Sequence, residues 1–330
     1  MSKGYFERKR RQHIIAFLIA AIVLFLALFS ALAVRMLKTS GDAELGTIEQ
    51  MEQEKDADPE GEDAEKEAKS DPLNVLVVDV GDAEAVLIDC GNVEILYDCG
   101  NEKDGEKVAK KIGEYVEGPL EYLILSHSHA DHVGGAPSVL KKYLVETIIT
   151  SGEKKGTSAE FDAAMKAANA EGGKILEDAD LTFDIGSGAT LNIIETYDPG
   201  QQEEDNPNNF SVIAYVTSSA GSVLVTGDSE AEAERLLKGK IRNVSVYIAA
   251  HHMSSTTNSA DLLSEWDPDY IIASCAGPKK SEYGFPHEQA LARCRAVCSE
   301  IYATYKSGDI LITLDENEGA SIDCSEEDRL

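Results

Sequence analysis

The chain has 330 residues and a formal net charge of -30 at pH 7, from 30 basic and 60 acidic residues. That length accommodates one large domain or two small ones with appendages. So acidic a chain argues against tight, sequence-independent binding to long nucleic acid, which needs many Lys and Arg contacts with phosphates. It leaves room for a single phosphodiester in a pocket whose field is set by metal ions.

The N-terminal region predicts a membrane anchor. Residues 14–34 are apolar and uncharged, and at about 1.5 Å per residue they cross a bilayer core of roughly 30 Å. A cleaved signal peptide is the alternative, but its apolar part is usually only about 7–15 residues long. The basic cluster Arg8–Arg11 precedes the span and favours a cytoplasmic N-terminus. We therefore expect a cytoplasmic tail at 1–13, a transmembrane anchor at 14–34, and a single-pass cell-membrane protein whose remainder is extracytoplasmic.

An acidic linker follows the anchor at 35–71. Its residues 39–71 carry 13 acidic side chains and three lysines, with few large apolar residues. Such a segment buries too little apolar surface to offset the entropy of ordering, so we expect it to be disordered.

The folded domain is expected at 72–330. Strand-like runs at 73–80, 85–90, 93–99 and 121–126 are followed by helix-like stretches near 134–142 and 158–170. The second half of the domain again combines strands with a helix: strands are expected near 210–218, 221–226, 244–250 and 269–274, and a helix at 287–299. Mixed strands and amphipathic helices predict an α/β domain with helices covering sheets. Within the last helix, Cys294 and Cys298 are four residues apart and are expected to be buried apolar side chains rather than metal ligands.

The sequence SHSHADHVGG at 126–135 carries the chemistry. His127, His129, Asp131 and His132 fall within six positions, directly after an apolar strand. Imidazole and carboxylate are ligands for Zn²⁺, Mn²⁺ or Fe. Alternate residues of an extended segment share a face, so His127 and His129 can reach one metal. Asp131 and His132 lie where the chain turns into a helix and can reach a second metal.

Six further segments stand out, in chain order VVDVGDAEAVLI (77–88), YDCG (97–100), NNFSVIAYV (208–216), VLVTGDSEAEAE (223–234), HHMSST (251–256) and EYGFPHEQAL (282–291). Together with SHSHADHVGG, they resemble motifs of the metallo-β-lactamase fold superfamily and, more narrowly, of the hydrolase domain of ComEC-type DNA-uptake competence proteins. The resemblance covers about residues 73–314. It implies an αββα metallo-β-lactamase sandwich and metal-dependent hydrolysis.

The resemblance also implies a ligand set for two divalent metals, Zn²⁺ or Mn²⁺. His127 and His129 would bind the first metal, Asp131 and His132 the second, and Asp228 would bridge both. His251 would complete the second site, with His252 as the alternative. The histidine that many family members place between the first motif and the Gly-Asp motif is missing, because no histidine occurs between 132 and 251. Either an amide or carboxylate near Asp205, Asn208 or Asn209 is expected to take its place, or a water fills the position.

The implied activity is phosphodiester hydrolysis, on a nucleic-acid strand or a phosphorylated wall or lipid ester. Asp131 and Asp228 would orient the attacking water, and His287 would contact a phosphate or protonate the leaving group, unless it is an ordinary surface histidine at a helix start. Lys279 and Lys280 could guide a phosphate, although a solvated turn is the simpler reading. Asp79, and Asp82 or Glu84, are expected near the site. A lactonase or β-lactamase activity, and a catalytically degenerate binding domain, are the alternatives.

Overall fold

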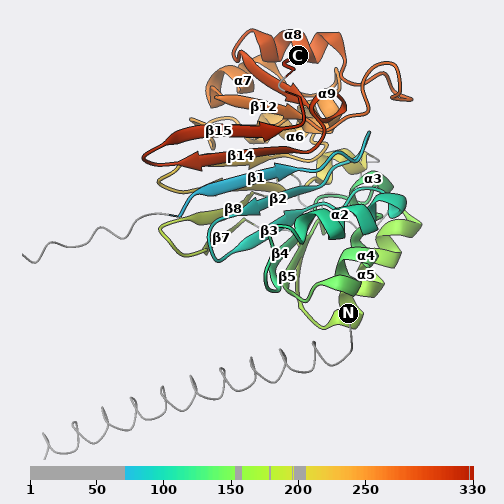
Figure 1. The fold of residues 1–330 in the computed structure, drawn as a ribbon. Coiled ribbons are helices and arrows are strands. Elements are labelled where there is room, and N and C mark those ends of the chain that lie inside the picture. Colours follow the sequence, from blue (N-terminus) through green and yellow to red (C-terminus); the bar gives the residue numbers. More distant parts are fainter. Residues whose placement is uncertain (1–70, 153–157, 178–179, 195, 197–205, 327) are drawn as a thin grey trace, which may run out of the picture. The chain divides into compact units, whose positions relative to one another are not determined.

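Two β-sheets lie face to face at the centre of the fold (Figure 1). The structure is a computed structural model that describes residues 71–152, 158–177, 180–194, 196, 206–326 and 328–330. Within these residues, one sheet has eight strands in the order β15 (Gly319–Cys324), β14 (Ile310–Asp315), β1 (Leu73–Val77), β2 (Val86–Asp89), β3 (Glu94–Tyr97), β4 (Leu120–Leu125), β5 (Val145–Thr150) and β6 (Lys174–Glu177). The other has seven, in the order β13 (Glu300–Ala303), β12 (Tyr270–Ala273), β11 (Val246–Ile248), β10 (Ser222–Val225), β9 (Ile213–Thr217), β8 (Thr190–Ile194) and β7 (Leu181–Asp184).

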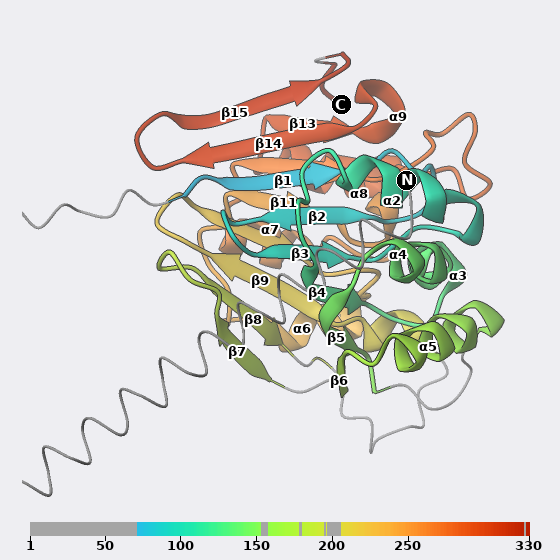
Figure 2. The same ribbon diagram turned by 60° about the horizontal axis from the view of Figure 1, so that its bottom comes forward.

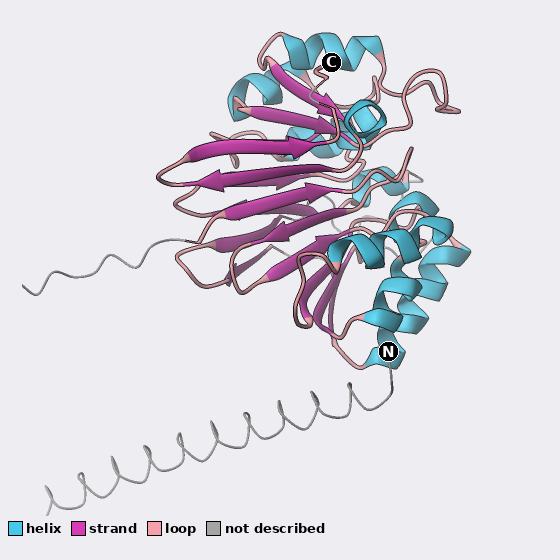
Figure 3. Cartoon of the chain, in the orientation of Figure 1, coloured by secondary structure: helices cyan, strands magenta, loops and turns pink. Residues whose placement is uncertain are grey.

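Helices cover the outer faces of both sheets (Figure 3). The first sheet packs against α2 (Gly105–Ile112), α4 (Ala136–Lys142) and α5 (Ala159–Glu171), which Figure 2 shows on the same side of the molecule. The second sheet packs against α7 (Ala260–Trp266) and α8 (Glu288–Arg295). The arrangement is a helix–sheet–sheet–helix sandwich, as the family resemblance implied; the pattern of strands and amphipathic helices predicted only that helices cover the sheets.

The alternation of side chains along each strand supplies this layering. In β1, Val75 and Val77 face the core between the sheets, whereas Leu76 faces the helices. The core between the sheets also takes Ile88 and Val223 from other strands. Because both faces of the central strands are buried, these strands are mainly apolar instead of alternating regularly with polar residues.

The cysteines contribute to these cores. Cys294 and Cys298 are buried among the side chains between the second sheet and its helices, as expected. All six cysteines are free thiols.

No helix among the described residues is long and apolar enough to cross a membrane. The expected tail at 1–13, the anchor at 14–34 and residues 35–70 of the expected linker lie outside the described residues.

The loops that carry the candidate ligands leave the sandwich at one edge. β3 and β4 run parallel in the first sheet, and β10 and β11 run parallel in the second. Parallel neighbours end at the same edge, so the segments that follow them meet there. Asp98 follows β3, the His127 loop follows β4, Asp228 follows β10, and His251 follows β11.

Candidate metal centre

The loop after β4 is anchored by a buried carboxylate from the neighbouring strand. Asp98 accepts hydrogen bonds from the Ser126 backbone N–H at 2.8 Å and from the Ser126 hydroxyl at 2.6 Å. The chain then turns into the short helix α3 (Ala130–Val133) and passes Gly134 and Gly135. A Cβ at Gly135 would lie 2.0 Å from the carbonyl oxygen of Cys99, so only glycine allows this close backbone approach.

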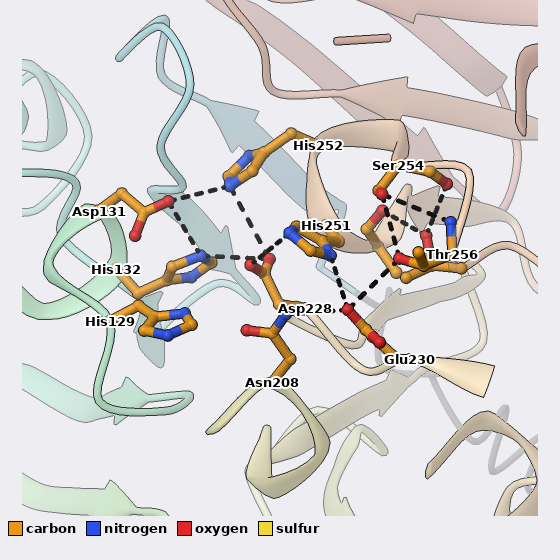
Figure 4. A network of polar contacts seen from close by, with 12 residues as sticks. His129, Asp131, His132, Asn208, Asp228, Glu230, His251, His252, Ser254 and Thr256 are labelled. Carbon is orange, nitrogen blue, oxygen red and sulfur yellow. Dashed lines mark hydrogen bonds and ion pairs between the residues drawn. The ribbon is translucent and has the colours of Figure 1, made fainter. Parts of the chain in front are cut away.

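Four side chains form the larger candidate ligand group. Asp131, His132, Asp228 and His252 each offer an atom within 4.8 Å of the others. His132 Nε2 lies 3.2 Å from Asp228 Oδ1, and His252 Nε2 lies 3.3 Å from Asp131 Oδ2 (Figure 4). The structure thus brings residues of both sheets together around one point.

Three side chains form a second group, namely His127, His129 and Asp228. His127 Nε2 lies 3.0 Å from His129 Nδ1 and 3.8 Å from Asp228 Oδ2. The two imidazoles therefore share a side of the loop, as expected from their alternate spacing.

Asp228 belongs to both groups. Its Oδ1 faces His132 and His252, at 3.2 and 3.8 Å, and its Oδ2 faces His127 and His251, at 3.8 and 3.6 Å. The Ser211 hydroxyl accepts a hydrogen bond from the Asp228 backbone N–H at 3.1 Å. One buried carboxylate can therefore present one oxygen to each of two metals.

Outer hydrogen bonds fix which nitrogen of each histidine faces the group. The Ser274 carbonyl oxygen, which can only accept, lies 2.9 Å from His252 Nδ1, so Nδ1 carries the hydrogen and Nε2 is free as a ligand. Asp98 Oδ2 lies 2.6 Å from His132 Nδ1, so this Nδ1 also carries the hydrogen and the Nε2 of His132 is free as a ligand. A carboxylate or carbonyl behind the ligating histidine orients the ring and raises its basicity.

The electrostatics of the group favour a bound cation. Burial disfavours charge, yet Asp228 and its neighbours raise the pKa of His132 well above its usual value and the pKa of His252 to about 9. Against the same burial, His132, His251 and His252 hold the pKa of Asp228 well below its usual range. Burial and the nearby His132 lower the pKa of His127. The ionised carboxylates thus attract positive charge, which protons supply in the metal-free protein and divalent metals can supply instead.

Unpartnered buried atoms support the same conclusion. His132 Nε2, Asp228 Oδ1 and Asn208 Oδ1 are buried and make no hydrogen bond among the described residues. Leaving such atoms unpaired costs free energy, and imidazole nitrogens with carboxylate and amide oxygens are suitable donors for a divalent metal. The residues present therefore fit a His/Asp site for divalent metal ions.

His252, and not His251, lies in the candidate group with Asp131 and His132, whereas the sequence favoured His251. The structure groups His252 with Asp131 and His132, whereas His251 Nε2 lies 3.6 Å from the other oxygen of Asp228. The backbone explains the difference: His251, His252 and Met253 all have positive φ, at 51°, 54° and 65°. Such strained conformations for non-glycine residues concentrate at functional sites.

Asn208 and Glu230 lie beside His251. Asn208 Nδ2 donates to Glu230 Oε1 at 3.2 Å, which leaves Asn208 Oδ1 as the atom without a hydrogen bond. His251 Nδ1 lies 3.6 Å from the same Glu230 oxygen. Asn209 Oδ1 instead accepts from the Glu230 N–H, and Asp205 lies outside the described residues.

His287 does not join the candidate ligands in either group. Its Nδ1 accepts from the Ser255 N–H at 2.9 Å, and its Nε2 lies 3.0 Å from the Tyr283 carbonyl oxygen. The ring packs edge-on against Phe285, which lies against His251 and His252. Both ring nitrogens of His287 therefore hydrogen-bond to backbone groups, those of Ser255 and Tyr283.

The acidic residues expected near the site divide into two kinds. Glu84 is buried in a group with Asp98 and His132, and burial raises its pKa to about 8. Asp79 and Asp82 are not among the candidate ligand groups; Asp82 accepts a hydrogen bond from the Ala276 N–H. Sequence reasoning gave no role to Asp98, although it stands in the YDCG block that was noted for its resemblance.

Comparisons with known proteins agree with this geometry. The model of the metallo-beta-lactamase superfamily matches residues 70–275. Recombination protein 2 of Haemophilus influenzae is 31% identical over 75% of this chain and 29% of its own length. ComE operon protein 3 of Bacillus subtilis is 26% identical over 58% of this chain and 24% of its own length. The chain thus spans less than a third of the length of these relatives.

Among solved structures, the metallo-beta-lactamase fold protein YhfI of Bacillus subtilis is similar, with a TM-score of 0.47 and 17% identity over 71% of this chain and 96% of that one. The family match covers the strands and loops that supply the candidate ligands from His127 to His252. With its sandwich of two sheets and its His/Asp site at their shared edge, the chain belongs to the metallo-beta-lactamase superfamily.

Proposed function

We propose that the chain is a membrane-anchored, extracytoplasmic two-metal phosphodiesterase that cleaves a nucleic-acid strand. One observation carries the proposal: Asp228 presents one oxygen to His127 and the other to His132. Two divalent metals, Zn²⁺ or Mn²⁺, would be held by His127, His129 and Asp228 on one side and by Asp131, His132, Asp228 and His252 on the other. Bound there, they would supply Lewis acidity that activates water and neutralises phosphoryl charge.

The protein's own groups divide the remaining work. Asp131 is 31% exposed at its side chain, whereas His132 and Asp228 are buried. Asp131 is thus the carboxylate that reaches the open side, where it can orient an attacking water and accept its proton. Asp228, whose backbone N–H is held by the Ser211 hydroxyl, would fix the position of the two ligand groups relative to each other. Preorganised charge of this kind stabilises developing charge without reorganisation cost.

Nucleic acid is favoured as the substrate because the relatives include one protein named for recombination and one named for competence. Because the chain is so acidic, we expect it to bind long nucleic acid weakly and to take a short stretch of one strand at the site. A phosphorylated wall or lipid ester is the second candidate, because the site itself requires only a phosphodiester. The anchor at 14–34 and the basic cluster Arg8–Arg11 support the membrane location.

The test uses the full chain in detergent, stripped of metal with EDTA and reloaded with Zn²⁺ or Mn²⁺. Hydrolysis is measured on labelled single-stranded DNA, p-nitrophenyl phosphorylcholine, a lactone and a β-lactam. We expect metal-dependent cleavage of DNA that Asp131→Ala abolishes. Asp261→Ala removes an exposed carboxylate on α7 and serves as the matched control. Turnover of only the lactone or β-lactam would refute the phosphodiesterase, and no turnover with two bound metals would leave a binding domain.

A further inference from the structure

An aromatic pair extends from the candidate metal centre to the surface. The Phe285 ring lies 5.6 Å from the rings of both His251 and His252, measured between centroids. Tyr283 stacks on Phe285 at 5.4 Å, with 28° between the ring planes. Yet Tyr283 is 68% exposed. One of its faces is therefore supported by protein while much of the ring remains open to solvent.

The loop holds this exposed ring in place. The Ser281 hydroxyl accepts hydrogen bonds from the backbone N–H groups of Tyr283 and Phe285, at 3.2 and 3.0 Å. The His287 ring hydrogen-bonds to the Tyr283 carbonyl, and the His287 N–H donates to the Met253 carbonyl at 3.0 Å. The loop is thus tied to the segment that carries His251 and His252. A ring that is already ordered loses little entropy on binding a ligand.

The same loop begins with two free cations. Lys279 and Lys280 are exposed, and neither forms an ion pair with another described residue. In a chain with a net charge of -30, two lysines without an ion-pair partner among the described residues, four and three residues before an exposed tyrosine, are a local departure. Cationic side chains next to an aromatic ring are the combination that binds single-stranded nucleic acid, through backbone phosphates and stacked bases.

We infer that Tyr283 is a stacking platform for the base of a nucleotide next to the scissile phosphodiester, with Lys279 and Lys280 facing a flanking phosphate. The identity of the ligand rests on the proposed function. Stacking accepts any base because every base has a π face. The platform would therefore favour nucleic acid over other phosphodiesters without selecting a sequence.

The experiment measures binding separately from cleavage. Fluorescence anisotropy gives the affinity of the full chain in detergent, loaded with metal, for two labelled DNA oligomers of equal length and charge. One carries thymine at every position and the other carries abasic spacers. Readings are taken within the first minutes, before turnover depletes the oligomer. The variants are Tyr283→Ala, Tyr283→Phe and, as a matched control, Leu144→Ala, because Leu144 is also exposed (67%) and precedes β5, at the end of that strand away from the site.

The protein is expected to bind the thymine oligomer on the order of 10-fold more tightly than the abasic one, as one stacked base provides. Tyr283→Ala should remove that preference by weakening only thymine binding, whereas Tyr283→Phe and Leu144→Ala should retain it. Equal affinities in the unmutated protein, or a preference that survives Tyr283→Ala, would overturn the platform. Failure of the proposed function appears differently, as absence of cleavage of both oligomers, and leaves the binding comparison readable.

Discussion

The two halves of the candidate metal centre are built unequally. The half around Asp228 Oδ1 has two imidazoles and the carboxylate of Asp131, and the Nδ1 atoms of its histidines are fixed by Asp98 and the Ser274 carbonyl. The half around Asp228 Oδ2 has His127 and His129 and no third histidine in its group. More ligands and firmer outer hydrogen bonds mean tighter metal binding. We therefore expect the half with His132 and His252 to fill first.

The largest expected effect tests whether Asp228 joins the halves. Asp228→Asn keeps the shape and removes the charge that faces four histidines. We expect loss of both metals by elemental analysis and a fall in turnover on the order of 10³-fold. Asp261→Asn, on the exposed face of α7, should bind metal normally. Retention of one tightly bound metal in Asp228→Asn would mean that the halves are independent.

The second prediction concerns pH in the metal-free protein. The pKa of His252 is about 9 in the fold against 6.5 unperturbed, so its stabilising proton is fully bound below pH 6.5 and lost as pH rises toward 9. The loss amounts to about 3 kcal/mol of unfolding free energy. The raised pKa of Glu84, about 8, acts in the same direction, because its folded carboxyl group also loses a proton over this range. Urea unfolding of EDTA-treated protein at pH 6.5 and 9 measures the sum.

His252→Gln isolates the share of His252 in that decline, and the metal-loaded protein should show less of it because metal replaces the proton. A stripped protein equally stable at pH 6.5 and 9 would remove the electrostatic argument.

The histidine pair tests which half each member serves. His252→Ala should weaken one of the two metals by roughly 100-fold, while His251→Ala should weaken binding much less, because His251 is not in the four-residue group. Calorimetric titration of stripped protein with Zn²⁺ resolves the two steps. If His251→Ala weakened metal binding more than His252→Ala, His251 would be the ligand, as the sequence favoured.

Asp98→Asn tests the outer hydrogen bonds of the tighter half. Asp98 contacts His132 at 2.6 Å and faces no ligand of the other half directly. Removing such a carboxylate commonly costs roughly 10- to 100-fold in metal affinity. The same titration should show the loss mainly at the tighter site. Equal weakening of both sites would indicate that the variant disorders the whole loop after β4, which Asp98 anchors through Ser126.

The smallest effect should come from Asn208→Ala. Its unpaired Oδ1 is the amide oxygen expected to stand in for the missing histidine, and a neutral amide is a weak ligand. We expect up to about a 10-fold loss at the weaker site alone, because one uncharged donor contributes little beside imidazole and carboxylate. Asn169→Ala, on the exposed side of α5, is the matched control. No change in Asn208→Ala would leave water or substrate as the remaining donor.

Local sequence pattern anticipated much of this protein. The strand and helix runs predicted sheets covered by helices, and the spacing of His127, His129, Asp131 and His132 placed four candidate ligands on one loop. These features depend on side-chain periodicity along a short segment, which does not require knowledge of the rest of the fold.

Only the tertiary structure shows which of His251 and His252 lies with Asp131 and His132. Alternation along a strand does not apply to them, because their backbone is left-handed and is held by a hydrogen bond from the His251 N–H to the Gly227 carbonyl, in the other loop. The roles of Asp98, behind His132, and of His287, in the Tyr283 loop, likewise depend on contacts between segments 28 or more residues apart. Residue type and spacing determined which side chains could bind metal; the packing of loops from two sheets determined which of them face one another.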